Sequence, residues 1–369
     1  QSTEFNEVGA GIQLGPNAVR RLATWGLLPA LKTYAVFPAN LHVRSAKTGA
    51  LLGSLPLGGR AVQRYGAAYA TIHRADLQQM LLQAALQQGV SVQLAQPFQA
   101  FTLNTSSEPP LSIQLAQNTV SADVLVAADG LRSAVRLQGW PGTEVRSTGQ
   151  RVFRSLLAQK QLPKHLRSND ITVWLGPQLH VVQYPVSGGG YLNLAAITPV
   201  AMAAQQATNA LPQHGDAGWD VQLNAMAVRA ALQGMCGALS EVVDAASHWR
   251  VWDVQALPPL RHARQMALGA VALLGDAAHP MRPYLAQGAG MAIEDAQSLA
   301  ESLARQPDHV ALALQAYAQA RWQRNSRVQA RAQRNGVLFH ARAPWSWARD
   351  LCVRCLGAKV LDIPWLYGH

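Results

Sequence analysis

The chain has 369 residues, of which 49% are hydrophobic and 14% are charged, a composition typical of a folded globular protein. This composition excludes a disordered chain, and the absence of 18 uninterrupted apolar residues predicts no integral membrane segment. Three cysteines, Cys236, Cys352 and Cys355, are too few for a disulfide scaffold and predict a reducing, cytoplasmic location. The Cys-x-x-Cys pair has no second ligand pair nearby, so no metal site is predicted.

The formal net charge of +11 raises the question of nucleic-acid binding. Much of the excess comes from arginines at three- and four-residue spacing in one helical segment, Arg321, Arg324, Arg327, Arg331 and Arg334. The sequence has no zinc-finger spacing, RNA-binding aromatic signature or basic zipper, so no nucleic-acid binding is predicted. We interpret the stripe as a solvated helix face, which could still attract an anionic substrate or cofactor.

Two local signals lie in the first 60 residues. The pattern predicts a helix over residues 16–25, because a proline stands at its start and Gly26 follows its end. Residues 40–57 alternate between polar and apolar side chains and turn at Thr48 and Gly49, which predicts a β-hairpin.

The next elements alternate between helix and strand. Residues 75–88 predict an amphipathic helix that ends at a glycine and leads into a strand at 90–94. Residues 122–136 predict a short buried strand that ends at Asp129, followed by a helical turn. Residues 148–260 are mainly strand-forming, and the chain after the next motif is mainly helical.

That motif, G-D-A-A-H-P-M-R-P-Y-L-A-Q-G-A-G, follows a predicted parallel strand at 269–274. Ligands of open α/β sheets lie beyond the carboxyl ends of such strands. Gly275 allows a close approach of the backbone, and the Asp276 carboxylate can accept hydrogen bonds from sugar-like hydroxyls. Gln287 and the small residues after it open a helix whose unpaired N–H groups favour negative charge. The sequence therefore predicts a site for a flat ring that becomes anionic on reduction, most simply a flavin. His279 is interpreted as a structural histidine.

Three motifs together resemble one family. G-D-A-A-H-P followed by Q-G-x-x-x-x-x-E-D-A is matched by residues 275–280 and 287–296, D-G-x-x-S-x-x-R by 129–136, and R-x-D-L by 74–77. Across essentially the whole chain, the sequence resembles the single-component FAD-dependent aromatic hydroxylases, which share the fold of para-hydroxybenzoate hydroxylase and include salicylate and 3-hydroxybenzoate hydroxylases. The resemblance implies FAD as cofactor and NADH or NADPH as co-substrate. It also implies hydroxylation of a phenolic or aromatic-acid substrate by O2 through a flavin hydroperoxide.

The resemblance also implies which residues form the site. The implied cofactor-binding residues are Arg74, Asp129, Gly275, Asp276, Pro283, Gln287, Gly288 and Ala289. The substrate contacts that we expect are Gln13, Arg154, Gln183 and Tyr284. The expected catalytic residues are His180 and Tyr184, which alternation along a strand places on one face. A residue that takes or shares the phenol proton is expected among His180, Gln183 and Tyr184. Arg154 either orients a substrate carboxylate or braces an interface between domains.

The expected fold class is α/β, with a Rossmann-like FAD-binding domain, an interleaved mixed-sheet substrate domain and a helical C-terminus. The FAD-binding domain is expected at 1–34, 72–147 and 262–330, the substrate domain at 35–71 and 148–261, and the C-terminal helical segment at 331–369. The family's G-x-G-x-x-G turn for the FAD pyrophosphate has no match, so we expect the chain to lack a first βαβ unit of roughly thirty residues. Such a chain alone is expected to bind FAD poorly and to be inactive.

Two alternatives stay open at this point. One is a hydroxylase of the ubiquinone-pathway type, which would act on a lipophilic substrate. The other is a non-catalytic module that keeps the flavoprotein fold. The residues do not decide which ring is hydroxylated, whether a carboxylate is lost, which nicotinamide cofactor is used, or whether the chain forms a homodimer.

Overall fold

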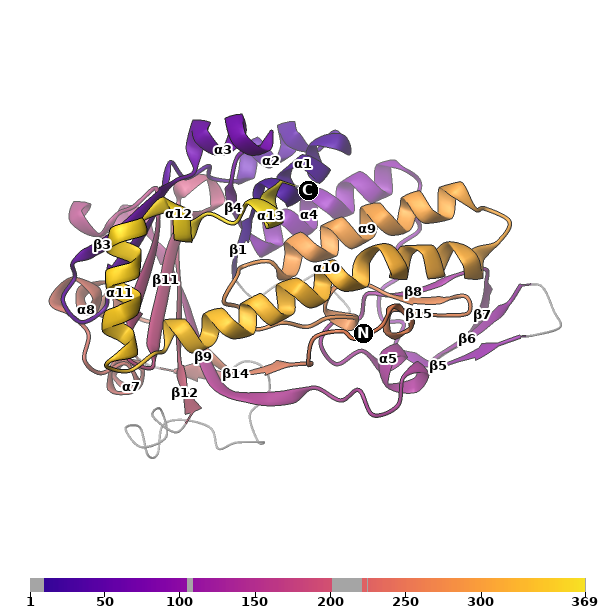
Figure 1. Cartoon of the computed structure of the whole chain (residues 1–369). Coiled ribbons are helices and arrows are strands. Elements are labelled where there is room, and N and C mark those ends of the chain that lie inside the picture. The colour runs from indigo at the N-terminus through magenta and orange to yellow at the C-terminus, as the bar shows by residue number, and fades with distance from the viewer. Residues whose placement is uncertain (1–9, 105–108, 201–220, 224, 369) are drawn as a thin grey trace. The chain divides into compact units, whose positions relative to one another are not determined.

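The computed structural model describes residues 10–104, 109–200, 221–223 and 225–368 (Figure 1). Its contacts divide the chain into two compact units. The first contains Ala84–Arg146 and Gln255–Arg334, and the second contains Glu7–Gln83, Ser147–Val254 and Asn335–His369. The expectation of a missing βαβ unit concerns the start of the chain and lies outside the described residues.

The second unit contains an eight-stranded mixed sheet in the order β13-β14-β9-β12-β11-β10-β2-β3. Strands β9, β12, β11 and β10 pair antiparallel, whereas β10 and β2 run parallel. The predicted hairpin at 40–57 is confirmed, with Gly49 in a left-handed turn at φ 75°. The strands are β2 (Asn40–Ser45), β3 (Leu51–Pro56), β9 (Arg146–Ala158), β10 (Ile171–Gly176), β11 (Leu179–Val186), β12 (Tyr191–Pro199), β13 (Val221–Leu223) and β14 (Trp249–Ala256).

The two faces of this sheet are covered differently. Because side chains alternate along a strand, Leu179 and Val181 of β11 point to one face and His180 and Tyr184 to the other. Leu179 and Val181 join a large apolar core with residues of α7 (Ala225–Ala231) and α8 (Gly237–Asp244). On the other face a smaller core includes Leu175 and Val353 of α11. The helices on that side are α11 (Trp345–Leu356) and α12 (Ala358–Leu361).

A two-stranded ribbon completes the second unit. Strands β1 (Gly11–Leu14) and β4 (Ala70–His73) pair antiparallel. The Gly11 N–H donates to Asn193 Oδ1 at 2.8 Å, and the Thr71 hydroxyl donates to a carbonyl of β11 at 2.5 Å. These contacts explain why residues 10–34 and 72–83, expected in the FAD-binding domain, group with the large sheet. The helices here are α1 (Pro16–Thr24), which confirms the predicted helix at 16–25, α2 (Leu28–Tyr34), α3 (Gly58–Tyr65), α4 (Arg74–Gln87) and α13 (Pro364–Tyr367).

The first unit holds two three-stranded sheets, in the orders β15-β16-β8 and β5-β6-β7. Strand β16 runs parallel to β8, which confirms the parallel strand predicted at 269–274. Helices α9 and α10 follow the sheets in the chain (Figure 1) and confirm the predicted helical region. The elements are β5 (Phe98–Leu103), β6 (Leu111–Leu115), β7 (Thr119–Ala122), β8 (Leu125–Ala127), β15 (Ala267–Leu268), β16 (Val271–Leu273), α5 (Ala134–Gly139), α9 (Gly288–Arg305) and α10 (Val310–Phe339).

The strand predicted at 90–94 is wrong. Helix α4 ends at Gln87, and the next strand of the chain is β5. Val90 and Val92 are 51% and 39% exposed, and within the described chain no strand pairs with this segment. An alternating pattern gives a strand only where a neighbour supplies the ladder hydrogen bonds. The strand expected within 122–136 exists as β8, but Val126 is 38% exposed, so the prediction that it is buried holds only in part.

Candidate cofactor and substrate sites

The turn after β16 places Gly275 and Asp276 beside helix α9. Gly275 has a φ of 59°, in the left-handed region, where a residue with a Cβ would be strained. A Cβ on Gly275 would also lie 3.0 Å from the Cβ of Ala292 in α9. Glycine is therefore required at position 275 for two reasons, the backbone conformation of the turn and its close packing against the helix.

Helix α9 begins with bare backbone next to that turn. Gln287 precedes the helix without capping it through its side chain, and the first turn carries no acidic residue. A Cβ on Gly288 would lie 3.9 Å from Asp276 Oδ1, so this carboxylate lies beside the start of the helix. The first amides of a helix have no intrahelical partner and carry partial positive charge. The arrangement joins a hydroxyl-accepting carboxylate to an anion-favouring helix end.

The D-G-x-x-S-x-x-R motif is tied directly to this turn. Asp129 Oδ2 accepts from the Ala134 N–H at 2.8 Å, so this carboxylate caps the start of α5. The Arg136 guanidinium is buried and donates to the Leu131 carbonyl at 2.6 Å and to the Ala277 carbonyl at 2.8 Å. Burial lowers the pKa of Arg136, while Asp129 and Asp276 act to raise it. Arg136 thus fastens one sequence motif to the backbone of the other.

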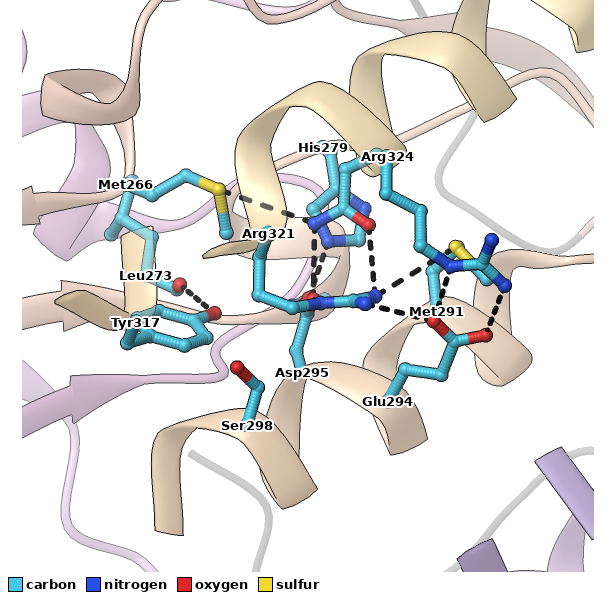
Figure 2. A network of polar contacts seen from close by, with 12 residues as sticks. Met266, Leu273, His279, Met291, Glu294, Asp295, Ser298, Tyr317, Arg321 and Arg324 are labelled. Atoms are coloured by element: carbon cyan, nitrogen blue, oxygen red, sulfur yellow. Dashed lines mark hydrogen bonds and ion pairs between the residues drawn. The ribbon is translucent and has the colours of Figure 1, made fainter. Parts of the chain in front are cut away.

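A buried ionic cluster lies under the turn, between α9 and α10 (Figure 2). Arg321 donates to Asp295 Oδ1 and to Glu294 Oε2, both at 2.8 Å, and Arg324 donates to Glu294 at 2.6 and 2.8 Å. The side chains of Arg321 and Arg324 are only 8% and 15% exposed. The interpretation of the arginine stripe as a solvated face is therefore wrong for these two residues, because α9 supplies counter-charges facing α10. Asn325 donates to the same Asp295 oxygen as Arg321, at 3.0 Å.

Asp295 also bonds the turn at two points. Its Oδ2 accepts from the Gly275 N–H at 3.2 Å and lies 2.5 Å from His279 Nε2. His279 is fully buried, and its Nδ1 has no hydrogen-bond partner among the described residues. Burial raises the pKa of Asp295, but His279, Arg321 and Asn325 outweigh it and lower the pKa to about 2. The carboxylate is therefore ionised across the physiological pH range.

In the second unit, Arg154 and Asn193 bring unpaired donors to one sheet face. The Arg154 guanidinium lies 4.9 Å from the centre of the Trp252 ring, and its Nε is buried without a hydrogen-bond partner among the described residues. Asn193 accepts from Gly11 through its oxygen, but its buried Nδ2 also finds no acceptor in the described chain. Burial lowers the pKa of Arg154, which Tyr184 raises and the neighbouring Arg74 charge lowers further. Unpaired buried donors in a native fold call for an external acceptor.

Gln13 lies between two buried tyrosines of the same unit. Tyr69 donates to Gln13 Oε1 at 2.9 Å, and the Tyr184 hydroxyl is also hydrogen-bonded to Gln13. Burial raises the pKa of Tyr184 to about 12, against the lowering effects of Arg154 and Gln13. Burial likewise raises the pKa of Tyr69 well above its usual value. Both side chains are therefore neutral phenols that can donate hydrogen bonds but cannot serve as ready bases.

His180 belongs to a buried histidine pair. Its Nδ1 lies 2.9 Å from His340 Nε2, and His340 Nδ1 lies 3.0 Å from Gln150 Nε2. Burial, and then His340, lower the pKa of His180 well below 6.5, while burial and Arg349 lower that of His340 to about 4. Both rings are neutral near pH 7. Gln183 points to the opposite sheet face and accepts from Trp174 at 3.3 Å, so the structure does not bring it together with His180 and Tyr184.

Comparison with known proteins identifies the family. A family model described as an FAD binding domain matches residues 18–332. The chain is 32% identical to a 3-hydroxybenzoate 6-hydroxylase of Polaromonas naphthalenivorans, over 100% of this chain and 88% of the relative. The chain belongs to the family of FAD-dependent aromatic hydroxylases. It is also 34% identical to a 3-amino-4-hydroxybenzoate 2-monooxygenase of Streptomyces platensis, again over 100% and 88% of the two chains.

Solved structures share the fold of this flavoprotein. A salicylate hydroxylase substrate complex superposes with a TM-score of 0.80 at 24% identity, covering 98% of this chain and 88% of the other. Klebsiella pneumoniae HpxO, complexed with FAD and uric acid, gives a TM-score of 0.81 at 22% identity, covering 98% and 87%. The expected α/β flavoprotein hydroxylase fold is therefore confirmed, and NAD(P)H is the co-substrate typical of the family.

The first unit of this flavoprotein fits its cofactor. The glycine cradle beside Asp276 leaves space that any side chain on Gly288 would fill, and the helix end there has no acidic residue that would repel FAD. Of the other predicted cofactor residues in this unit, Pro283 is exposed, Gln287 is buried and Ala289 is half-buried. Arg74 is exposed at the start of α4 in the second unit, and Tyr284, a predicted substrate contact, is buried in the first.

Sequence reasoning missed several residues of both sites. Asp295 matches a position of the family motif, but no role is predicted for it from the sequence. An acid next to the buried stripe of α9 needs a partner, which is the signal that could have identified it. Its partner Arg321 was hidden by exposed arginines at the same helical spacing. Tyr69 had no signal, because nothing local links it to Gln13. Where the structure describes the chain, no cluster of metal-ligating side chains is found and no helix has the length and apolar character of a bilayer crossing.

Proposed function

We propose that this chain hydroxylates a phenolic aromatic acid, with FAD as cofactor, NAD(P)H as reductant and O2 as oxidant. The observation that carries the choice of an acid is Arg154, whose buried Nε lacks a partner among the described residues. Because the Arg154 guanidinium is planar and stacks on Trp252, the N–H groups along its edge are left to face a ligand. Such an edge can bind a carboxylate through two hydrogen bonds. Relatives named as hydroxybenzoate hydroxylases agree with this substrate class.

When bound, FAD supplies electron transfer from NAD(P)H and the activation of oxygen. The protein's part in the first unit is to hold it. Asp276 would accept hydrogen bonds from the hydroxyls of FAD, and Gly288 and Ala289 would hold the cofactor beside backbone with little or no side chain. The start of α9, whose first turn has no acidic residue, would favour negative charge on the cofactor.

In the second unit each polar group has a distinct role toward the substrate. Arg154 holds the carboxylate, and Tyr184 donates a hydrogen bond from a phenol that stays protonated. His180, whose ring burial keeps neutral near pH 7, shares the phenol proton through a hydrogen bond. Drawing that proton away from the phenol oxygen makes the aromatic ring more electron-rich and therefore more reactive.

Two further parts of the proposal rest on the sequence and on the family. The cysteine content supports a cytoplasmic location, and the chemistry of the family requires O2. The proposal favours a small aromatic acid over the lipophilic substrate of a ubiquinone-type hydroxylase, since Arg154 offers a charge to a carboxylate.

The test is oxidation of NAD(P)H by the FAD-loaded protein over a panel of phenols. The panel contains hydroxybenzoates, the corresponding phenols without carboxylate, and one long-chain lipophilic phenol. We expect hydroxybenzoates to stimulate oxidation most. The product should be heavier than the substrate by one oxygen or, if a hydroxyl replaces a carboxylate lost as CO2, lighter by the mass of CO2 minus one oxygen. Stimulation by the lipophilic phenol alone would favour the ubiquinone type. Binding of FAD without any stimulation would favour a non-catalytic module.

A further inference from the structure

Asp295 divides its two oxygens between the cofactor turn and helix α10. Oδ2 accepts a hydrogen bond from the Gly275 N–H and contacts His279 Nε2. These two residues are the ends of a five-residue turn. Oδ1 accepts from Arg321 and Asn325 on α10 (Figure 2). The carboxylate is fully buried. It therefore acts as a clamp that fixes a short piece of backbone to a rigid pair of helices.

The clamped piece contains Asp276, the side chain that the site offers to the ribityl hydroxyls. Gly275 is held at a φ of 59°, and the His279 N–H returns to the Gly275 carbonyl at 2.9 Å. Arg136 holds the same turn from the other side through the carbonyl of Ala277. With both sides held, the direction of Asp276 relative to Gly288 is set before the cofactor arrives, which lowers the entropy lost on binding.

We propose that Asp295 is a positioning residue for FAD, which keeps Asp276 and the start of α9 in their binding arrangement through Gly275 and His279. The proposal rests on the flavin site of the proposed function. It assigns to this buried carboxylate a role beyond stability. Glu294, its neighbour on α9, bonds Arg321 and Arg324 and provides a comparison within the same cluster.

Asp295→Asn and Glu294→Gln form the matched pair of the test. Each replaces one buried carboxylate of the cluster by its amide, and each leaves a buried guanidinium short of one negative charge. In Asp295→Asn, however, the amide NH2 must face either the donors of the turn or those of α10. Both variants are made in the full-length protein. The free energy of unfolding is measured in urea, and the dissociation constant for FAD is measured by equilibrium dialysis.

We expect both variants to lose similar stability, whereas FAD affinity falls at least about tenfold in Asp295→Asn and at most about twofold in Glu294→Gln. Equal loss of FAD affinity in the two variants would overturn the proposal, as would unchanged affinity in Asp295→Asn. A wild-type full-length protein that binds no FAD would overturn both this role and the proposed function. FAD binding without hydroxylation would contradict the proposed function alone, because the role of Asp295 is tested by FAD affinity and not by hydroxylation.

A second pair keeps the test decisive if Asp295→Asn does not fold. In His279→Gln the amide nitrogen replaces Nε2 and can still donate to Asp295, whereas His279→Ala removes this bond. We expect His279→Ala to weaken FAD binding about tenfold and His279→Gln to restore it to within about threefold of wild type. Equal affinities in His279→Ala and the wild type would refute the clamp.

Discussion

Two buried polar clusters, one in each unit, differ in how their charged groups are paired. In the first unit the charges of Asp295 and Glu294 are met by Arg321 and Arg324, with hydrogen bonds of 2.6 to 2.8 Å. In the second unit a guanidinium Nε of Arg154 and an amide nitrogen of Asn193 are buried without partners in the described chain. The acidic and arginine side chains of the first cluster are paired with one another, so we call this cluster closed. The second cluster keeps buried donors without partners in the described chain, so we call it open.

This difference separates support from recognition. A closed cluster cannot offer its charges to a ligand, since every exchange would leave a buried charge unpaired. It can hold backbone in place, as it does for the turn at Gly275. An open cluster costs stability until an acceptor arrives, and such groups gather where ligands bind. Substitutions that break contacts of closed groups should therefore have the largest effects, and substitutions on the open side smaller ones.

The largest effect is expected at Arg136, which has a closed set of contacts. In Arg136→Met the carbonyls of Leu131 and Ala277 lose a buried donor, and the turn loses its second anchor. We expect the free energy of unfolding to fall by about 4 kcal/mol, measured in urea. Arg136→Lys keeps the charge with fewer donors and should lie between. A loss below about 1 kcal/mol in Arg136→Met would show that the contacts are dispensable.

On the open side, Arg154→Gln should change recognition and leave stability nearly intact. The proposed carboxylate contact is charge-assisted and buried beside Trp252, so its loss should lower kcat/KM for a hydroxybenzoate about 100-fold, or about 3 kcal/mol. For a phenol without a carboxylate the same variant should change kcat/KM by less than about threefold. Equal losses for both substrates would mean that Arg154 braces the fold instead.

The closed cluster should also leave a signature in acid. The pKa of Asp295 is depressed from 3.8 to about 2, so the stability it contributes is complete above pH 3.8 and is lost as pH falls toward 2. The shift corresponds to about 2 kcal/mol. Unfolding free energies of wild type and Asp295→Asn, measured in urea between pH 5 and the lowest pH at which both fold, should converge as pH falls. Parallel curves would contradict an ionised carboxylate with a depressed pKa.

The sequence predicts different amounts of the structure around the two clusters. The strand, the Gly-Asp turn and helix α9 were predictable, because Gly275, Asp276 and Gly288 carry backbone requirements that only a few residue types meet. The ion pairs beneath were not, since periodicity reports which helix face is apolar and cannot report that α9 offers acids to α10. Arg321 and Arg334 look alike at helical spacing, yet only Arg321 meets a buried acid.

In the second unit the sequence predicted a shared face for His180 and Tyr184 from strand alternation alone. It could not find Tyr69 or His340, which come from segments more than a hundred residues away and share no local pattern with β11. The grouping of Gln183 with His180 ignored the same alternation, because neighbours an odd number of positions apart lie on opposite faces. One sequence does not determine contacts between distant segments, nor whether a segment such as 90–94 finds a neighbouring strand to pair with.

The smallest effect is expected at Tyr184, which belongs to the open face but stays neutral. Since its pKa is about 12, the hydroxyl donates a hydrogen bond and does not act as a base. Tyr184→Phe should therefore lower kcat/KM for a hydroxybenzoate about fivefold, or about 1 kcal/mol, with the shape of the pH profile unchanged between about pH 6 and 10. Tyr69→Phe, which removes the other hydroxyl on Gln13, is the matched control and should have a smaller effect on kcat/KM. A loss of several hundredfold in Tyr184→Phe, or a missing limb in its pH profile, would assign the proton transfer to Tyr184 and remove it from His180.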